Sequence, residues 1–324
     1  MCTAISVVEG GHYFGRTLDY EHSFGESATV TPRKFPLRFT DGKMVQDHYA
    51  LVGTAHIRSG FPLYYDAVNE KGLCAAGLNL THSTLYAAPK NDGTDIAHYE
   101  LILKLLSLCA SVDEAVEMLI NSNITDSRFD EDTPSAKLHW LISDKMRSIT
   151  VEVIGGIVSI IENKIGVLTN EPQFLEQLTK LSDYMSLSAS QPQNNAFRGI
   201  DPMPYSRGMG AIGLPGDLSS SSRFVRVAFF KSNIKLCEDN KTNIGRIFDV
   251  LGTVKQPYGC CEVADRVYEK TIYTSCCDAQ QGIYYYTTEN NHRITAVSIN
   301  NCDINGYRLW HYPMNDNDDI FYLN

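Results

Sequence analysis

The second residue of the chain, Cys2, is the first candidate for chemistry. Removal of the initiator Met1, which a small neighbouring side chain permits, would place a thiol and a free α-amine on one residue. An α-amine has a pKa of about 7.7–8.0 and a cysteine thiol one of about 8.5, so the amine can accept the thiol proton near neutral pH. Cys2 is therefore predicted to be a nucleophile with its own general base, although a cysteine at this position of an arbitrary chain usually has no such role.

Two β-rich segments at the start of the chain flank Gly10-Gly11, a pair typical of a two-residue hairpin turn. With this turn Asp19 lies opposite Cys2, where its carboxylate can hold the new α-ammonium group. Arg16 lies near the same strand end, and its guanidinium would favour the thiolate. Strict alternation puts Arg16 and Asp19 on opposite faces, so this interpretation requires a bulge or bend after Arg16. An exposed pair of Arg16 and Asp19 on a strand is the alternative.

Further motifs follow in order along the chain. They are Met1-Cys2-Thr3-Ala4, Phe14-Gly15-Arg16-Thr17-Leu18-Asp19, Pro62-Leu63-Tyr64-Tyr65-Asp66-Ala67, Ala76-Gly77-Leu78-Asn79, Leu138-His139-Trp140, Gly166-Val167-Leu168-Thr169-Asn170, and Tyr205-Ser206-Arg207-Gly208-Met209-Gly210 continuing to Gly213-Leu214-Pro215-Gly216-Asp217-Leu218-Ser219-Ser220. On these residues the sequence closely resembles the choloylglycine hydrolase family of N-terminal-nucleophile hydrolases, which contains bile salt hydrolases and penicillin V acylases. The resemblance spans nearly the whole chain.

The resemblance implies a catalytic set whose members are all of the matching residue type. They are Cys2, Arg16, Asp19, Asn79, Asn170 and Arg223. In the family the two asparagines form or support the oxyanion hole, and a donor aimed at a developing oxyanion can lower the barrier by ~3 kcal/mol. Judged singly, an asparagine at a strand end is more often a turn former, and an arginine is ordinarily solvated.

The resemblance also implies the reaction and the substrate. A thiolate attacks an amide carbonyl, the amine leaves, and the Cys2 thioester is hydrolysed, with no cofactor and no metal. Asn79 stands where bile-salt members of the family typically have asparagine and penicillin V acylases tyrosine, so we expect hydrolysis of glycine- or taurine-conjugated bile salts, with penicillin V acylase activity as the alternative. The family's mobile substrate loops correspond to segments that carry Phe24, Phe61 and Phe129, which with Leu18 could line an apolar pocket.

Two functions of other classes stay open. A glutamine amidotransferase also uses a nucleophilic cysteine at position 2, but it usually has glycine next and a second synthase domain, whereas this chain has Thr3 and 324 residues in all. A steroid-binding module without catalysis could use the same scaffold. The complete six-residue catalytic set disfavours the second alternative.

The elements that must position these residues are of mixed type. Strands are predicted at 2–8, 12–18, 49–54, 64–80, 137–143, 147–154, 157–162, 165–170, 271–277, 282–288 and 294–300, and helices at 96–109, 112–121, 172–187, 221–233 and 243–253. The four strands between 137 and 170 are expected to form an antiparallel meander. Because runs of strands are segregated from runs of helices, the fold class is predicted to be α+β, and the resemblance implies a four-layer αββα sandwich of N-terminal-nucleophile hydrolase type.

Composition limits the remaining possibilities. The 324 residues, 43 % hydrophobic and 20 % charged, are expected to fold as a single domain, 1–324, interrupted by a long Pro/Gly/Asn-rich loop at about 190–217. In the family the matching region extends from the subunit and makes a tetramer, so a homotetramer is expected. The net charge of −10 has the wrong sign for nucleic-acid binding.

The N-terminus and the cysteines indicate the compartment. The first residues lack the basic segment and the apolar run of a secretory signal, and no stretch approaches the ~20 apolar residues of a membrane helix, so a cytoplasmic protein without a membrane partner is expected. Nine cysteines are an odd number without zinc spacing, and most are predicted to be buried reduced thiols.

Overall fold

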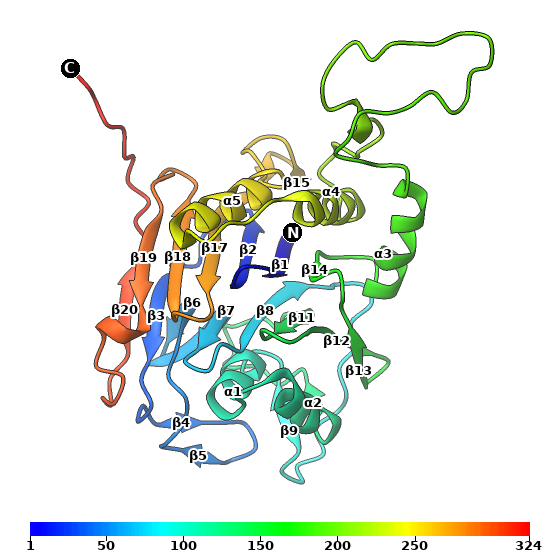
Figure 1. Ribbon diagram of the computed structural model, residues 1–324. Coiled ribbons are helices and arrows are strands. Elements are labelled where there is room, and N and C mark those ends of the chain that lie inside the picture. Colours follow the sequence, from blue (N-terminus) through cyan, green and yellow to red (C-terminus); the bar gives the residue numbers. More distant parts are fainter.

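Two large antiparallel sheets lie face to face in the computed structural model, which describes residues 1–324 (Figure 1). The first sheet has the order β14 (Val167–Leu168), β1 (Cys2–Val8), β2 (His12–Tyr20), β17 (Lys270–Asp278), β18 (Ile283–Thr288) and β19 (Thr295–Ser298). The second has the order β13 (Ile157–Glu162), β12 (Ser148–Ile154), β11 (Leu138–Ser143), β8 (Cys74–Asn79), β7 (Phe61–Asn69), β6 (Leu51–Arg58), β3 (Ser27–Thr31) and β20 (Trp310–Pro313).

Helices cover the outer face of each sheet and complete a four-layer αββα sandwich, as predicted (Figure 1). On the six-stranded sheet lie α4 (Ser220–Asn233) and α5 (Asn240–Gly252), with α3 (Phe174–Lys180) packed against α4. On the eight-stranded sheet lie α1 (Leu101–Leu108) and α2 (Val112–Ile120). Serine or aspartate side chains cap three of these helices by accepting a backbone N–H of the first turn, at Ser111, Ser219 and Asp239.

Short elements complete the chain. They are β4 (Leu37–Arg38), β5 (Met44–Val45), β9 (Asp95–Ala97), β10 (Asn123–Thr125), β15 (Glu262–Ala264), β16 (Val267–Tyr268) and the 3₁₀ turns Leu181–Tyr184, Met209–Ala211 and Ile299–Asn301. No helix is both long and apolar enough to cross a membrane. No group of three or more His, Cys, Asp or Glu side chains is placed to hold a metal ion.

The hydrophobic core consists of two clusters, which lie between different layers of the sandwich. One cluster of 35 buried residues fills the space between the sheets and beneath α4 and α5, and a second of 24 lies between the eight-stranded sheet and α1 and α2. Because both sheets are covered on both faces, the inner strands are buried along almost their whole length; all seven residues of β1 except the last are buried. This burial fixes the N-terminal strand, and with it Cys2.

The N-terminal hairpin forms where predicted, but its register differs by one residue. Val8 pairs with His12, so the connection has three residues, and Cys2 lies opposite Leu18 and not Asp19. Gly10 has a φ of +62°, which glycine adopts without strain. In this register Cys2, Leu18 and Arg16 share one face, so no bulge is needed between Arg16 and Asp19.

A bulge does occur on the neighbouring strand. In β17 the register shifts between Thr271 and Tyr273, which pair with Asp19 and Leu18 respectively, so that Ile272 is the extra residue. This bulge brings the Thr271 side chain to Asp19.

Several other predicted elements are corrected by tertiary contacts. β11, β12 and β13 form the expected meander, but β14 leaves it and pairs with β1 in the other sheet. The predicted helix 96–109 begins only at Leu101, because residues 95–97 pair with β10 instead. The helix predicted over 172–187 is shorter, Phe174–Lys180, and continues as a 3₁₀ turn.

All nine cysteines are free, and five of them are buried, as expected. Cys276 and Cys277 are buried on β17, whereas Cys260 and Cys261 do not lie in the core. Cys260 is exposed and both precede β15 in irregular chain, so their side chains do not face a sheet interior.

Residues 190–217 form a long excursion that projects away from the layered body (Figure 1). Its only regular element is the 3₁₀ turn Met209–Ala211. Large apolar side chains along it are exposed, among them Met203 at 79 % and Tyr205 at 85 %. Such a surface is unusual for a segment that contacts only water.

Candidate active site

A cavity of about 300 Å³ opens beside the N-terminal strand. Cys2, at the start of β1 and only 3 % exposed, lines it together with Arg16 from β2 and Asn79 from the end of β8. Most of the remaining lining is apolar or aromatic and includes Leu18, Tyr20, Phe24, Leu63, Tyr65, Tyr99 and Leu138. A thiol, a guanidinium and an amide thus meet at one wall of an apolar pocket, which is the composition of a small-molecule site.

Arg16 is completely buried behind the thiol. Its Nη1 donates to the carbonyl oxygens of Gly77 at 2.8 Å and Tyr65 at 3.0 Å, whereas its Nη2 has no partner. Burial acts to lower the pKa of Arg16, but the neighbouring Cys2, Tyr273 and Asp66 raise it above its ordinary value. The guanidinium therefore stays charged beside Cys2.

Asp66 supplies a buried negative charge near Arg16. Its carboxylate accepts hydrogen bonds from the hydroxyls of Tyr273, Ser275 and Tyr284, the last two at 2.8 Å. Burial raises the pKa of Asp66, while Arg16 and these donors act to lower it. No sequence motif marks the contact, because it joins β7 of one sheet to β17 and β18 of the other.

Asn170 and Arg223 hold the backbone of Cys2. The Oδ1 of Asn170 accepts the backbone N–H of Cys2 at 2.8 Å and an Nη2 hydrogen of Arg223 at 2.7 Å. Nη1 of Arg223 donates to the Cys2 carbonyl oxygen and to Oγ1 of Thr3. Arg223 lies in the first turn of α4 and is 0 % exposed, so it is not a solvated arginine.

Asn79 and Asn170 are joined across the two sheets. Nδ2 of Asn170 donates to the backbone oxygen of Asn79 at 2.8 Å, whereas the side-chain amide of Asn79 makes no hydrogen bond and lines the cavity. The Asn170 amide is thus committed to Cys2 and Asn79, and the Asn79 amide is free to donate to a bound group.

Asp19 lies on the other face of the sheet from the Cys2 side chain and is completely buried, so the alternative of an exposed pair with Arg16 is wrong. Its carboxylate accepts hydrogen bonds from Oγ1 of Thr271 at 2.6 Å and Oγ1 of Thr17 at 3.1 Å. The α-nitrogen of Cys2 is therefore bonded to Asn170, not to Asp19. Asp19 acts on the site through its charge, which opposes the lowering of the Arg223 pKa by burial.

Met1 extends the pairing of β1 and β2 by one residue, since Asp19 donates its N–H to the Met1 oxygen and accepts from the Met1 amine. The Met1 ammonium also forms an ion pair with Glu269, which is 5 % exposed. Burial lowers the pKa of this amine. No motif of the sequence points to Glu269, which is the single residue between β16 and β17.

The four predicted pocket residues divide into two pairs. Leu18 and Phe24 line the cavity, with the Phe24 ring 5.0 Å from that of Tyr20. Phe61 and Phe129 do not line it, and the expectation that they do is wrong in this structure. Their rings pack instead against Tyr99, which does line the cavity, at 6.4 Å and 5.4 Å between ring centroids.

The site and fold define an amide hydrolase with an N-terminal nucleophile. The family model of linear amide C–N hydrolases, choloylglycine hydrolase family, matches residues 2–312, and the chain belongs to this family. This assignment favours an amide hydrolase over a glutamine amidotransferase or a binding module without catalysis.

Single relatives and solved structures that resemble this chain support the same family assignment. The chain is 45 % identical to the bile salt hydrolase/transferase of Lactiplantibacillus plantarum over 100 % of both chains. Its structure superposes with a TM-score of 0.91 on a variant of the conjugated bile acid hydrolase of Clostridium perfringens, at 34 % identity and over 100 % of both chains. The penicillin V acylase of Agrobacterium tumefaciens shares the fold, with a TM-score of 0.78 and 21 % identity over 97 % of this chain and 91 % of that one.

Proposed function

We propose that this protein is a bile salt hydrolase that cleaves the amide bond of glycine- or taurine-conjugated bile salts. The observation that carries the proposal is the apolar cavity beside Cys2 with the free amide of Asn79 in its wall. An apolar acyl group fits such a cavity, and the amide carbonyl then lies between a nucleophile and a hydrogen-bond donor. The relatives named for bile acids match over the full chain, which supports the same substrate here.

In the proposed mechanism the mature chain begins at Cys2, and its α-amine takes the thiol proton. The thiolate, stabilised by Arg16, attacks the amide carbonyl, and Asn79 donates to the oxyanion that forms. The proton passes to the leaving nitrogen, glycine or taurine departs, and water hydrolyses the Cys2 thioester. Asn170 and Arg223 keep the α-amine in place throughout, and the step needs neither cofactor nor metal.

The test is product release from glycocholate, taurocholate and penicillin V, measured side by side on one preparation. Hydrolysis of one or both bile salts with a higher kcat/KM than penicillin V is the expected result. A preference for penicillin V would instead establish the alternative, a penicillin V acylase of the same family.

Asn79→Tyr is expected to lower bile-salt turnover more than penicillin V turnover, by roughly tenfold in the ratio of kcat/KM values. Tyrosine removes the amide from the cavity wall and fills space that a steroid would occupy, but it retains a hydroxyl donor. Kinetics on both substrates check this. Equal losses would show that Asn79 serves general oxyanion chemistry and not selectivity.

We further propose that residues 190–217 assemble a homotetramer and that the rest of 1–324 forms one catalytic domain. The support is the excursion itself, whose exposed apolar side chains need a partner surface. Deletion of much of 195–212 is expected to yield smaller, less stable assemblies. Size-exclusion chromatography with light scattering checks this, and a deletion variant that keeps the full-size assembly contradicts it.

We also propose a cytoplasmic location. The nine free thiols support it, because a reducing compartment keeps cysteines unpaired. Fractionation of the producing cells, with activity measured in each fraction, tests this location.

A further inference from the structure

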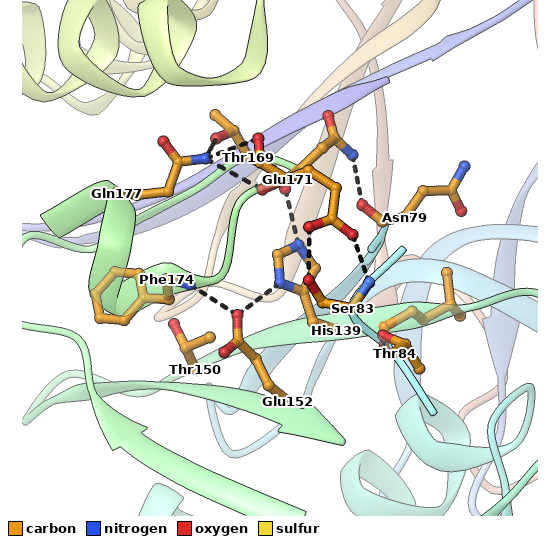
Figure 2. A network of polar contacts seen from close by, with 12 residues as sticks. Asn79, Ser83, Thr84, His139, Thr150, Glu152, Thr169, Glu171, Phe174 and Gln177 are labelled. Atoms are coloured by element: carbon orange, nitrogen blue, oxygen red, sulfur yellow. Dashed lines mark hydrogen bonds and ion pairs between the residues drawn. The ribbon is translucent and has the colours of Figure 1, made fainter. Parts of the chain in front are cut away.

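Glu171, the residue after Asn170, reaches across to the loop that follows Asn79 (Figure 2). Its Oε1 accepts the backbone N–H groups of His82 and Ser83, both at 2.8 Å, and its Oε2 accepts the hydroxyl of Ser83 at 2.8 Å. These two N–H groups have no other acceptor in the structure. One side chain therefore satisfies three donors of a loop that belongs to the other sheet.

The segment that carries Glu171 is itself held firmly. Nε2 of Gln177, a residue 2 % exposed, lies 3.1 Å from the backbone oxygen of Asn170 and 3.3 Å from that of Glu171. Oγ of Ser220 accepts the backbone N–H of Asn170 at 2.8 Å. The loop after Asn79 is thus tied to a part of the molecule that cannot easily shift.

His139 adds a further contact to the same segment (Figure 2). Its buried imidazole lies between the carboxylate of Glu152, at 3.2 Å, and the backbone oxygen of Thr169, at 2.9 Å. The same Glu152 oxygen accepts the N–H of Phe174 at 2.9 Å, which fixes the start of α3. Contacts therefore hold the chain on both sides of Asn170 and Glu171.

The Glu171 carboxylate suits its three donors chemically. Burial acts to raise the pKa of Glu171, but the donors from Ser83 and His82 lower it below its ordinary value, so the group is ionised at neutral pH. Hydrogen bonds to a charged acceptor are stronger than those between neutral groups.

We propose that Glu171 is a positioning residue that fixes the side chain of Asn79 at the cavity wall by clamping the loop at His82 and Ser83. The strand end that carries Asn79 is held at its backbone by the pairing of Asn79 with Leu138 and by the bond from Asn170 to the Asn79 oxygen. The Glu171 contacts, three and four residues further along, hold the turn that follows, where the pairing with β11 has ended. The inference rests on the proposed role of Asn79 as the donor to the oxyanion. It adds which contact holds the Asn79 amide at the cavity wall.

The test is a double-mutant cycle between Glu171→Ala and Asn79→Ala, read as kcat on folded enzyme. Glu171→Ala removes all three contacts and is expected to lower kcat roughly tenfold with little change in KM, because misplaced groups affect the transition state most. In the Asn79→Ala background the same change should have almost no further effect, since there is no amide left to position.

Three further measurements distinguish a positioning role of Glu171 from a general loss of structure in the variant. Glu171→Gln should retain kcat within about threefold, because its amide oxygen can accept both N–H groups while its NH₂ donates to Ser83. Glu176→Ala, on an exposed acidic residue of α3 without side-chain hydrogen bonds, is the matched control and should match the wild type. Alkylation of Cys2 by iodoacetamide should keep its rate in Glu171→Ala, since Asn170 and Arg223 still hold Cys2.

Should Glu171→Ala fail to fold, Ser83→Ala removes only the third contact and should show a smaller loss of kcat that likewise vanishes in the Asn79→Ala background. Wild-type kcat in Glu171→Ala, or an equal loss with and without Asn79, overturns the inference. Failure of the proposed function is seen separately: a wild-type enzyme inactive on both bile salts refutes the substrate, and the cycle is then read on penicillin V.

Discussion

Cys2→Ser is expected to lower kcat for glycocholate by about 10³-fold or more. The α-amine of residue 2 has a pKa close to that of a thiol but far below that of an alcohol, so it can generate a thiolate and not an alkoxide. Arg16, whose guanidinium is buried beside the thiol, is expected to favour the thiolate further. The free energy of unfolding should hardly change, because serine is nearly isosteric with cysteine and Cys2 packs at the edge of the core.

The control for Cys2→Ser is Cys260→Ser, which removes an exposed thiol and should leave kcat unchanged. Turnover, thermal unfolding and intact mass are measured on the same preparations. The active wild-type protein should have the mass of a chain that begins at Cys2. Full activity in a protein that retains Met1, or in Cys2→Ser, would refute the N-terminal nucleophile.

Asp19→Asn is expected to lower kcat by roughly tens-fold or more, because a small misplacement of a reacting group can cost up to about 10²-fold in rate. The amide can keep both hydrogen bonds, since its oxygen can accept from Thr271 and its NH₂ can donate to Thr17. What it loses is a buried negative charge that balances Arg223, the residue that grips Cys2 and Asn170. Arg223 should then hold the backbone of Cys2 less accurately, with a direct effect on proton transfer.

Because Asp19 is completely buried, its substitution should also lower the free energy of unfolding, by about 1–3 kcal/mol. An exposed charge at a strand end would cost less. Thermal unfolding and glycocholate turnover, measured together, separate the two effects. A variant that unfolds at a much lower temperature but keeps near-wild-type kcat per folded molecule would show that Asp19 is structural.

Local patterns in the sequence were sufficient for the chemistry and for most elements. Cys2 after the initiator indicated the nucleophile, and the alternation on both sides of Gly10-Gly11 indicated the hairpin that carries Arg16. The segregation of strands from helices indicated the α+β class, and the family resemblance implied the four layers that the structure confirms. These features could be predicted because each depends on residues that are close to one another in the sequence.

The register of the hairpin needed more than local pattern. A two-residue and a three-residue turn fit Gly10-Gly11 equally well, and the choice decides whether Asp19 or Leu18 faces Cys2. Packing on both faces of the sheet decides it, because a slip of one residue would exchange the side chains of β2 between the two faces. Tertiary packing also decided the burial of Asp19 and the removal of β14 from the meander.

The arrangement of the site depended on the tertiary structure altogether. Asn79 ends a strand of one sheet, Asn170 follows a strand of the other, and Arg223 comes from a helix above them, so only the stacking of the layers brings them to Cys2. The contact of Glu171 with Ser83 has the same origin. The sequence alone determined which groups could react, whereas their meeting depended on contacts between residues far apart in the chain, whose geometry no local periodicity encodes.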